Sequence, residues 1–201
     1  VARYPIEFLS SVGQLPETVN QAVLNERGLY VMQGLDQALA EQLVESSSQP
    51  HIAEFCPNDP TKRFGSVDKV LAWQSKGRLA LPLVKKAGNG ALVLAGFGWM
   101  GPGKPGDDEP TILGAETTFA IRIYNEAVGQ GNALPYTKAI LDANNALYGN
   151  HGVWLEAWGD NAAALKAYER VGFQKVAEIP GSRHGEEFTR VYMTLGNIAT
   201  H

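Results

Sequence analysis

Short runs of apolar residues recur along this chain and predict most of a β-sheet. Two of these runs, at 79–86 and 91–97, form a hairpin through the turn residues Gly88-Asn89-Gly90. The remaining runs are bounded by polar or turn residues, as expected for strands. They lie at 29–32, 121–124, 152–158, 173–178 and 187–195.

Between these runs, apolar residues recur at a spacing near 3.6, which predicts amphipathic helices. The expected helices are at 17–25, 35–44, 67–74, 135–147 and 161–171. Strands that alternate with helices in the second half indicate a βαβ unit with parallel strands. The chain is therefore expected to be an α/β protein.

The helix at 161–171 has clear signals at both of its ends. Asp160 or Asn161 can cap its first turn with a side-chain oxygen, and Gly172 allows a left-handed exit. Ala164, Tyr168 and Val171 share one face, so the tyrosine is expected to point toward the body of the protein. A core tyrosine that only packs is the simpler interpretation of this position.

A strand, a glycine turn and a helix start follow one another between residues 121 and 135. The first amides of a helix lack intrahelical acceptors and lie at its positive end, so this arrangement predicts an anion site. Small residues at Gly129, Gly131 and Ala133 would let a diphosphate approach the backbone, and Gln130 and Asn132 could add side-chain donors.

These two segments together resemble the signature motifs of the GNAT superfamily of acyl-CoA-dependent N-acyltransferases. Asn161, Tyr168 and the Gly-Phe pair at 172–173 resemble one motif, and Gly131 and Ala133 match the last fixed positions of another. Val128 departs from that motif, where Arg or Gln is usual.

The resemblance implies acetyl-CoA as co-substrate and an amine of a small molecule, peptide or protein as acceptor. It implies that Asn161 contacts the pantetheine arm and that Tyr168 protonates the departing thiolate. It further implies that the backbone of Ile121 and Ile123 pairs with the arm and that residues 128–133 hold the diphosphate.

The same resemblance implies a single GNAT domain over residues 1–201, of α/β (α+β) class. The expected sheet is mixed, with about six or seven strands, flanking helices and two splayed central parallel strands. Residues 116–173 would form the acyl-CoA-binding core, and residues 1–27 an N-terminal extension.

A group that removes the proton of the amine is also expected. Glu116 is the first candidate, because it opens the strand that leads to the anion turn and some GNAT members place a glutamate there. Its register is about one residue off, so a bulge would be needed to bring it to the right face. His184, in the last hairpin, is the second candidate.

Two other function classes remain as alternatives. One is an acyl-CoA-binding regulatory module without turnover. The other is a dinucleotide-dependent enzyme, because Gly96, Gly98 and Gly101 spell a dinucleotide-binding fingerprint after an apolar run. The prolines at 102, 105 and 110 argue against the helix that this fingerprint requires. The glycine-rich stretch is instead expected to be a mobile loop, acting as a lid or a simple linker.

Composition adds a few constraints. The chain has 17 Lys plus Arg and 21 Asp plus Glu, a net charge of −4, which gives no indication of nucleic-acid binding. The single cysteine, Cys56, excludes an intramolecular disulfide and a multi-cysteine metal site, so no metal is expected. No membrane span or export signal is apparent, so a cytoplasmic protein is expected, and a homodimer is the commonest assembly for such a chain.

Overall fold

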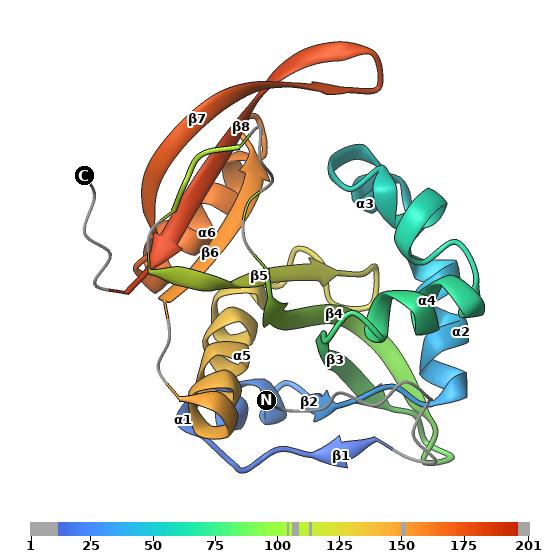
Figure 1. Cartoon of the computed structure of the whole chain (residues 1–201). Helices are drawn as coiled ribbons and strands as arrows, with labels where there is room; N and C mark the ends of the chain where they lie inside the picture. Colours follow the sequence, from blue (N-terminus) through green and yellow to red (C-terminus); the bar gives the residue numbers. More distant parts are fainter. Residues whose placement is uncertain (1–11, 104, 106–108, 113, 150–151, 197–201) are drawn as a thin grey trace.

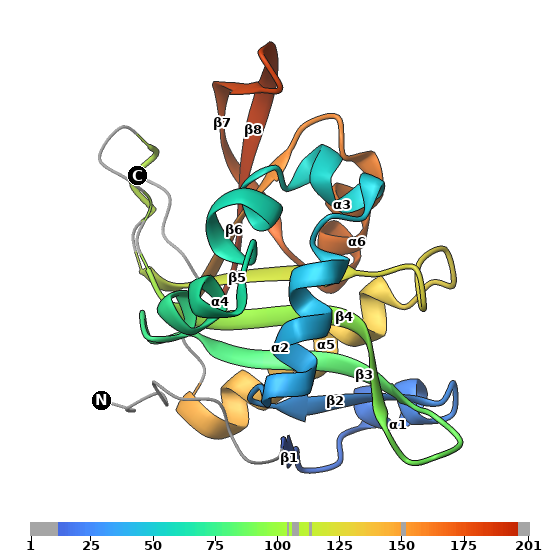
Figure 2. The same ribbon diagram turned by 90° about the vertical axis from the view of Figure 1, so that its right-hand side faces the viewer.

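An eight-stranded mixed sheet with helices on both faces forms the framework of the molecule (Figures 1 and 2). The computed structural model describes residues 12–103, 105, 109–112, 114–149 and 152–196. The strand order is β1-β2-β3-β4-β5-β6-β8-β7, and only β5 and β6 pair in parallel. The strands are β1 (Gly13–Gln14), β2 (Leu29–Gln33), β3 (Leu79–Lys86), β4 (Leu92–Pro102), β5 (Ala115–Ile123), β6 (Gly152–Trp158), β7 (Gln174–Arg183) and β8 (Glu186–Leu195).

Helices cover both faces of this sheet. They are α1 (Val19–Asn25), α2 (Gln37–Ser46), α3 (Pro50–Phe55), the π-helical turn η1 (Asp59–Arg63), α4 (Val67–Gln74), α5 (Ala133–Tyr148) and α6 (Ala162–Val171). One hydrophobic cluster joins the sheet to α1, α5 and α6. A second cluster joins it to α2, α3 and α4 on the opposite face. No helix within the described ranges is both long and apolar enough to cross a membrane.

The sequence predicted the order of these elements, and α4 has the predicted bounds. The sheet contains one strand more than the six or seven expected, the two-residue edge strand β1. Helix α3 and turn η1 were not predicted, because each is too short to show a helical period. Strand β7 reaches Arg183, so the last hairpin turns at His184 and Gly185 and is longer than expected.

The stretch from Gly96 to Pro102 is not the predicted loop. It lies within β4, pairs with β3 on one side and with β5 on the other, and is buried as far as Gly101. Both faces of this central strand are covered, so its residues do not alternate between polar and apolar. Its sequence therefore resembles that of a glycine-rich loop. An antiparallel strand cannot be the turn of a βαβ dinucleotide site, so that alternative is wrong. The predicted lid lies partly outside the described residues.

The glycines of β4 let helix α5 pack close to the sheet. A Cβ at Gly98 would lie 2.2 Å from Ile140 Cδ1 and 3.0 Å from the hydroxyl oxygen of Tyr136. That hydroxyl is buried and donates a hydrogen bond of 2.6 Å to the Leu81 carbonyl oxygen on β3. These contacts place α5, and therefore its N-terminus, at a fixed height above the sheet.

Replacing Gly98 with Ala should therefore overpack the contact with α5 and lower the free energy of unfolding by about 1–3 kcal/mol. Gly88→Ala is the matched control, because Gly88 lies in the β3–β4 turn and a Cβ there would meet no heavy atom within 4 Å. Urea denaturation of both variants measures the difference. Equal stability of the two variants would contradict this explanation of the glycines.

Candidate functional site

Strands β5 and β6 separate after a short paired segment. Their parallel pairing covers Ala115 to Thr118 on β5 and Gly152 to Trp154 on β6. Beyond that point β5 continues to pair with β4, and β6 with β8. A gap therefore opens between the carboxyl halves of the two central strands, as the splay expected from the sequence requires (Figure 1).

The exposed edge of β5 presents backbone groups to this gap. The Tyr124 amide donates to the Ala95 carbonyl oxygen at 3.0 Å, so the pair Ile123–Gly96 is a non-hydrogen-bonded pair of the β4–β5 ladder. The N–H and C=O groups of Ile123, and of Ile121 two residues earlier, consequently point away from β4. Ile121 and Ile123 thus offer the backbone edge that the resemblance assigned to the pantetheine arm.

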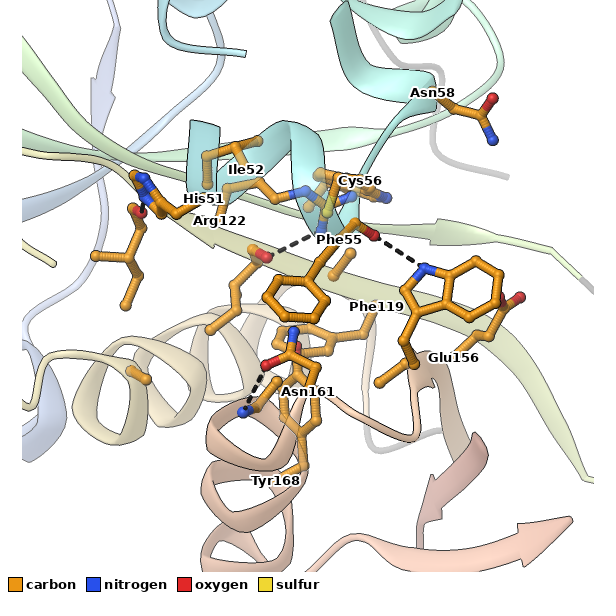
Figure 3. A pocket seen from close by; sticks show the side chains of 18 of the residues that line it. His51, Ile52, Phe55, Cys56, Asn58, Phe119, Arg122, Glu156, Asn161 and Tyr168 are labelled. Carbon is orange, nitrogen blue, oxygen red and sulfur yellow. Dashed lines mark hydrogen bonds between the residues drawn. The ribbon is translucent and has the colours of Figure 1, made fainter. Parts of the chain in front are cut away.

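Side chains bind the two carbonyl groups of this edge. Arg122 Nη1 donates to the Ile121 carbonyl oxygen at 2.9 Å, and His51 Nε2 lies 3.0 Å from the Ile123 carbonyl oxygen. His51 belongs to α3, whose other end is also tied down, because Trp158 Nε1 on β6 donates to the Phe55 carbonyl oxygen at 3.0 Å. Helix α3 therefore spans the gap from β5 to β6 (Figure 3).

The turn before α5 has the geometry expected of an anion site. Gly129 and Gly131 have φ values of 75° and 70°, which favour glycine, and a Cβ at either position would meet no atom within 4 Å. Among the described residues no side chain caps the first turn of α5, so its leading amides are not engaged in that way. Together these features leave an open backbone at the positive end of a 16-residue helix.

Asn132 has a different role from the one suggested by the sequence. Its side chain is buried, donates through Nδ2 to the Ala127 carbonyl oxygen at 3.0 Å, and accepts through Oδ1 from Arg27 Nη1 at 2.9 Å. The amide thus holds the turn together, and we do not assign it as a side-chain donor to an anion. Gln130 is exposed and is not among the described residues that line the cleft.

Nothing in the sequence predicts that Arg27 has a role at this turn. It follows α1, and its Nη1 atom also lies 3.3 Å from the carbonyl oxygen of Gln130 and 3.4 Å from that of Gly131. Helix α1 packs on α5 and is joined to it by the hydrogen bond from Asn20 Nδ2 to Asp142 Oδ2 at 2.7 Å. The segment expected to be a separate extension therefore supports the anion turn and brings a cation to it.

Helix α6 carries Asn161 and Tyr168 into the same cleft. Asn161 is its N-cap and accepts from the Ala164 amide at 3.2 Å through Oδ1. Asp160, the other candidate for the cap, instead forms an ion pair with Arg183, whose hydrogen bonds lower the pKa of Asp160. The helix ends at Gly172 in the left-handed conformation, as predicted.

Tyr168 is held by two aromatic rings. Its ring centroid lies 6.0 Å from that of Phe119 on β5 and 5.8 Å from that of Phe173, with edge-to-face geometry at Phe119. No described residue forms a hydrogen bond with its hydroxyl group. Burial raises the pKa of Tyr168 to about 12, while the nearby positive charge of Arg122 acts in the opposite direction. The phenol is therefore protonated at neutral pH.

A cleft of about 1010 Å³ connects these features. It extends from the anion turn along the β5 edge to α6, and on the other side it is bordered by α3, η1 and the last hairpin. The predicted site residues that line it are Ile121, Ile123, Val128, Gly129, Gly131, Asn132, Ala133, Asn161 and Tyr168.

Glu116 is not part of this lining. The bulge that it would need does exist, because Ala115 pairs with Gly152 and Thr117 with Val153, which leaves Glu116 as the extra residue on β5. Its side chain is nevertheless exposed, and the structure does not bring it together with Tyr168. One residue of register decides the face of a strand, and sequence alone did not determine which face the bulge would select.

Another carboxylate faces the cleft instead. Glu156 on β6 lies in the lining (Figure 3) and is oriented by Arg190, whose Nε donates to its Oε1 at 2.8 Å. His184, the second candidate for a base, also lies in the lining, at the tip of the last hairpin. Its Nε2 is 3.1 Å from the Glu54 carbonyl oxygen.

Arg122 and Cys56 form the floor of the cleft beside α3. Burial by itself would lower the pKa of Arg122, but the adjacent Asp59 carboxylate outweighs this effect and raises it, so Arg122 is a permanent cation. Burial raises the pKa of the Cys56 thiol, which keeps it protonated and a poor nucleophile. Cys56 is more than 60 residues from either motif along the chain, but the fold brings it into the cleft.

The described part of the chain contains no candidate metal site. No set of three or more His, Cys, Asp or Glu side chains there could hold a metal ion.

Comparison with known proteins supports the fold independently. No protein-family model and no curated protein matches the sequence. Solved structures do match, among them a putative acetyltransferase, yncA, from Salmonella typhimurium with acetyl-CoA, at 19% identity and a TM-score of 0.62. That alignment covers 84% of this chain and 93% of the other.

A second match is spermidine N-acetyltransferase from Vibrio cholerae in complex with CoA and spermine. It has a TM-score of 0.66 and 16% identity, over 84% of this chain and 95% of the other. An aminoglycoside acetyltransferase, AAC(6')-Ib, in complex with coenzyme A has a TM-score of 0.58 and 16% identity, over 84% and 94% of the two chains. This chain has the fold of the GNAT acetyltransferases, as its two motifs indicated.

Arg27→Ala should loosen the anion turn, because it removes the donor shared by two turn carbonyl groups and the Asn132 side chain. We expect the Kd for acetyl-CoA to rise about tenfold, the effect of losing about 1.4 kcal/mol. S-acetylpantetheine, which lacks the diphosphate, should bind the variant and the parent protein equally.

Calorimetry with both ligands makes this comparison, and Arg27→Lys is the control that keeps the charge but loses the planar donor group. An equal loss of affinity for both ligands would show that Arg27 supports the fold in general rather than the anion turn.

Proposed function

We propose that this protein transfers an acetyl group from acetyl-CoA to an amine. The observation that carries the proposal is the open edge of β5 at Ile121 and Ile123, which runs from the anion turn toward Tyr168 in one cleft. An amine as acceptor is supported at the level of the fold by the neighbour whose structure contains CoA and spermine.

In this proposal, each part of acetyl-CoA is assigned to a different group of described residues in the cleft. The diphosphate would bind the amides of Gly129 to Ala133, where a helix start and Arg27 supply positive charge. The amides of the pantetheine arm would pair with the edge at Ile121 and Ile123. Asn161 Oδ1 is engaged in the helix cap, so its Nδ2 atom is the side-chain donor toward the arm.

Direct attack requires no covalent enzyme intermediate. The amine nitrogen forms a bond to the thioester carbonyl carbon, the carbon–sulfur bond breaks, and sulfur leaves with the bonding electrons. Tyr168 gives its proton to that sulfur and recovers one from solvent, while the new amide loses the proton carried by the amine nitrogen. The buried, protonated phenol is suited to this role because it holds its proton throughout the neutral range.

The amine must reach the cleft and lose a proton before it attacks. At pH 7 only about one free amine in a few thousand is neutral, given a pKa of about 10.4. We assign Glu156, rather than Glu116, to receive the ammonium group, because Glu156 is the carboxylate among the described residues that line the cleft. Arg190 holds this carboxylate in position, and its proposed effect is to hold the amine in place.

Tyr168→Phe should lower kcat about 100-fold, because it removes the proton donor to the leaving sulfur. The phenyl ring retains the contacts with Phe119 and Phe173, so the Kd for acetyl-CoA and the melting temperature should remain nearly unchanged. Release of free CoA and calorimetry provide the two measurements. Unchanged turnover would remove the acid role, and acetyl-CoA binding without turnover in the parent protein would favour a regulatory module.

The pH dependence of turnover tests the same assignment. Because burial raises the pKa of Tyr168 to about 12, its acid form persists as the pH rises past 10, the ordinary value for a phenol, and is lost only near 12. We therefore expect no alkaline decline of kcat with an apparent pKa near 10. A decline there that disappears in Tyr168→Phe would mean that the phenol is not buried as described.

A further inference from the structure

Positive charge is concentrated in the cleft of a chain that is negative as a whole. The net charge of the protein is −4. The described residues that line the cleft nevertheless include six basic side chains and one carboxylate, Glu156. The six are Lys62, Arg63, Lys76, Arg78, Arg122 and Arg183. An excess of this kind in a cleft focuses the electrostatic field and attracts anions.

These cations are not placed where the phosphates of acetyl-CoA would bind. None belongs to the anion turn or to α6. They come from η1, the link between α4 and β3, β5 and the end of β7. Figure 2 shows α4 near the end of β5 opposite to the turn that precedes α5. The positive charge therefore lies mainly away from the proposed diphosphate site.

The most strongly positioned cations share one carboxylate. Arg122 Nε donates to Asp59 Oδ2 at 2.7 Å, and Arg63 Nη1 donates to Asp59 Oδ1 at 3.0 Å. The Asp59 side chain is fully buried and that of Arg122 is 12% exposed, whereas that of Arg63 is 41% exposed. Two guanidinium groups against one carboxylate leave one positive charge beside the cleft.

The other lining cations differ in how far they add to this excess. Arg183 is neutralised by Asp160 and is enclosed by the rings of Phe55 and Phe188. Lys62 and Lys76 are exposed at the rim, and no described residue forms an ion pair with either. A positive charge that is partly removed from water is stabilised by an added anion more than one at an open surface is.

Resting on the proposed function, we propose that the acceptor is an amine that also carries an anionic group, a carboxylate or a phosphate. Its ammonium group faces Glu156, and its anionic group faces the side of the cleft formed by Arg63 and Arg122. Figure 3 shows Glu156 and Arg122 at this cleft, and they belong to different strands, so a small molecule that carries both charges has a partner for each in the same cleft. Acetylation then removes the cationic end of the acceptor and weakens its hold at Glu156, which favours release of the product.

Matched pairs of amines test the proposal, because the members of a pair differ in the anionic group. The pairs are L-phenylalanine with L-phenylalaninamide, L-methionine with L-methioninamide, and O-phosphoethanolamine with ethanolamine, and spermine serves as a purely cationic amine. CoA release gives kcat/KM for each compound. In at least one pair we expect the anionic member to be favoured at least tenfold, and spermine to be a poor acceptor.

Arg63→Gln should abolish this preference without changing the KM for acetyl-CoA, and thermal denaturation measures any loss of stability from the missing contact with Asp59. Lys166→Gln, an exposed lysine on α6 outside the lining, is the matched control and should retain the preference. Neutral amines or spermine used as well as the anionic members would overturn the proposal while leaving the acetyltransferase function intact.

If no turnover occurs, direct binding measurements distinguish the anionic-acceptor proposal from the proposed acetyltransferase function. Calorimetric titration of the parent protein with L-phenylalanine and O-phosphoethanolamine should show saturable binding of at least one, lost in Arg63→Gln. Such binding without any CoA release would support an anion-binding role for Arg63 and Arg122 and contradict the proposed function. No binding of either compound, with no turnover of either, would overturn the anionic-acceptor inference.

Discussion

The separation of β5 from β6 is the constraint on which the rest of this structure depends. A parallel ladder that continued to Ile123 would satisfy every backbone group and leave no space between the strands. The ladder instead stops at Thr118, and the carbonyl groups of Ile121 and Ile123 accept from Arg122 and His51. A ligand can replace these side-chain hydrogen bonds without breaking any hydrogen bond between strands. The gap is therefore compatible with a stable fold and open to a ligand.

Two arginines stabilise the ends of this gap by different means. Arg27 approaches the anion turn from outside and binds carbonyl groups that no helix or strand uses. Arg122 lies on β5 itself and is fixed by the buried carboxylate of Asp59 and by the face of Trp99, with its guanidinium carbon 4.8 Å from the ring centroid. A buried carboxylate without its partner would be strongly destabilising, so Asp59 and Arg122 form one unit of the fold.

Local signals predicted much of the candidate site. The cap at Asn161, the exit at Gly172 and the turn glycines at 129 and 131 all depend on conformations within a few residues, and all are present. The positions of Glu116 and of the Asn132 side chain, and the role of the β4 glycines, could not be predicted, because the face of a bulged strand, the partner of a buried amide and the helix that packs on a strand are long-range properties. Nothing in the sequence near Arg27 indicates that its side chain reaches a turn more than 100 residues away.

The sequence by itself determined which segments form the anion turn, the central strands and helix α6, since short-range sterics and hydrogen bonding specify these elements. Only the tertiary structure decided which side chains surround the cleft. Arg27, Glu156 and the pair of Arg63 and Arg122 reach it from separate elements that pack together. Their collective charge is a property of that packing, because Coulomb interactions depend on distance in space and not on separation along the chain.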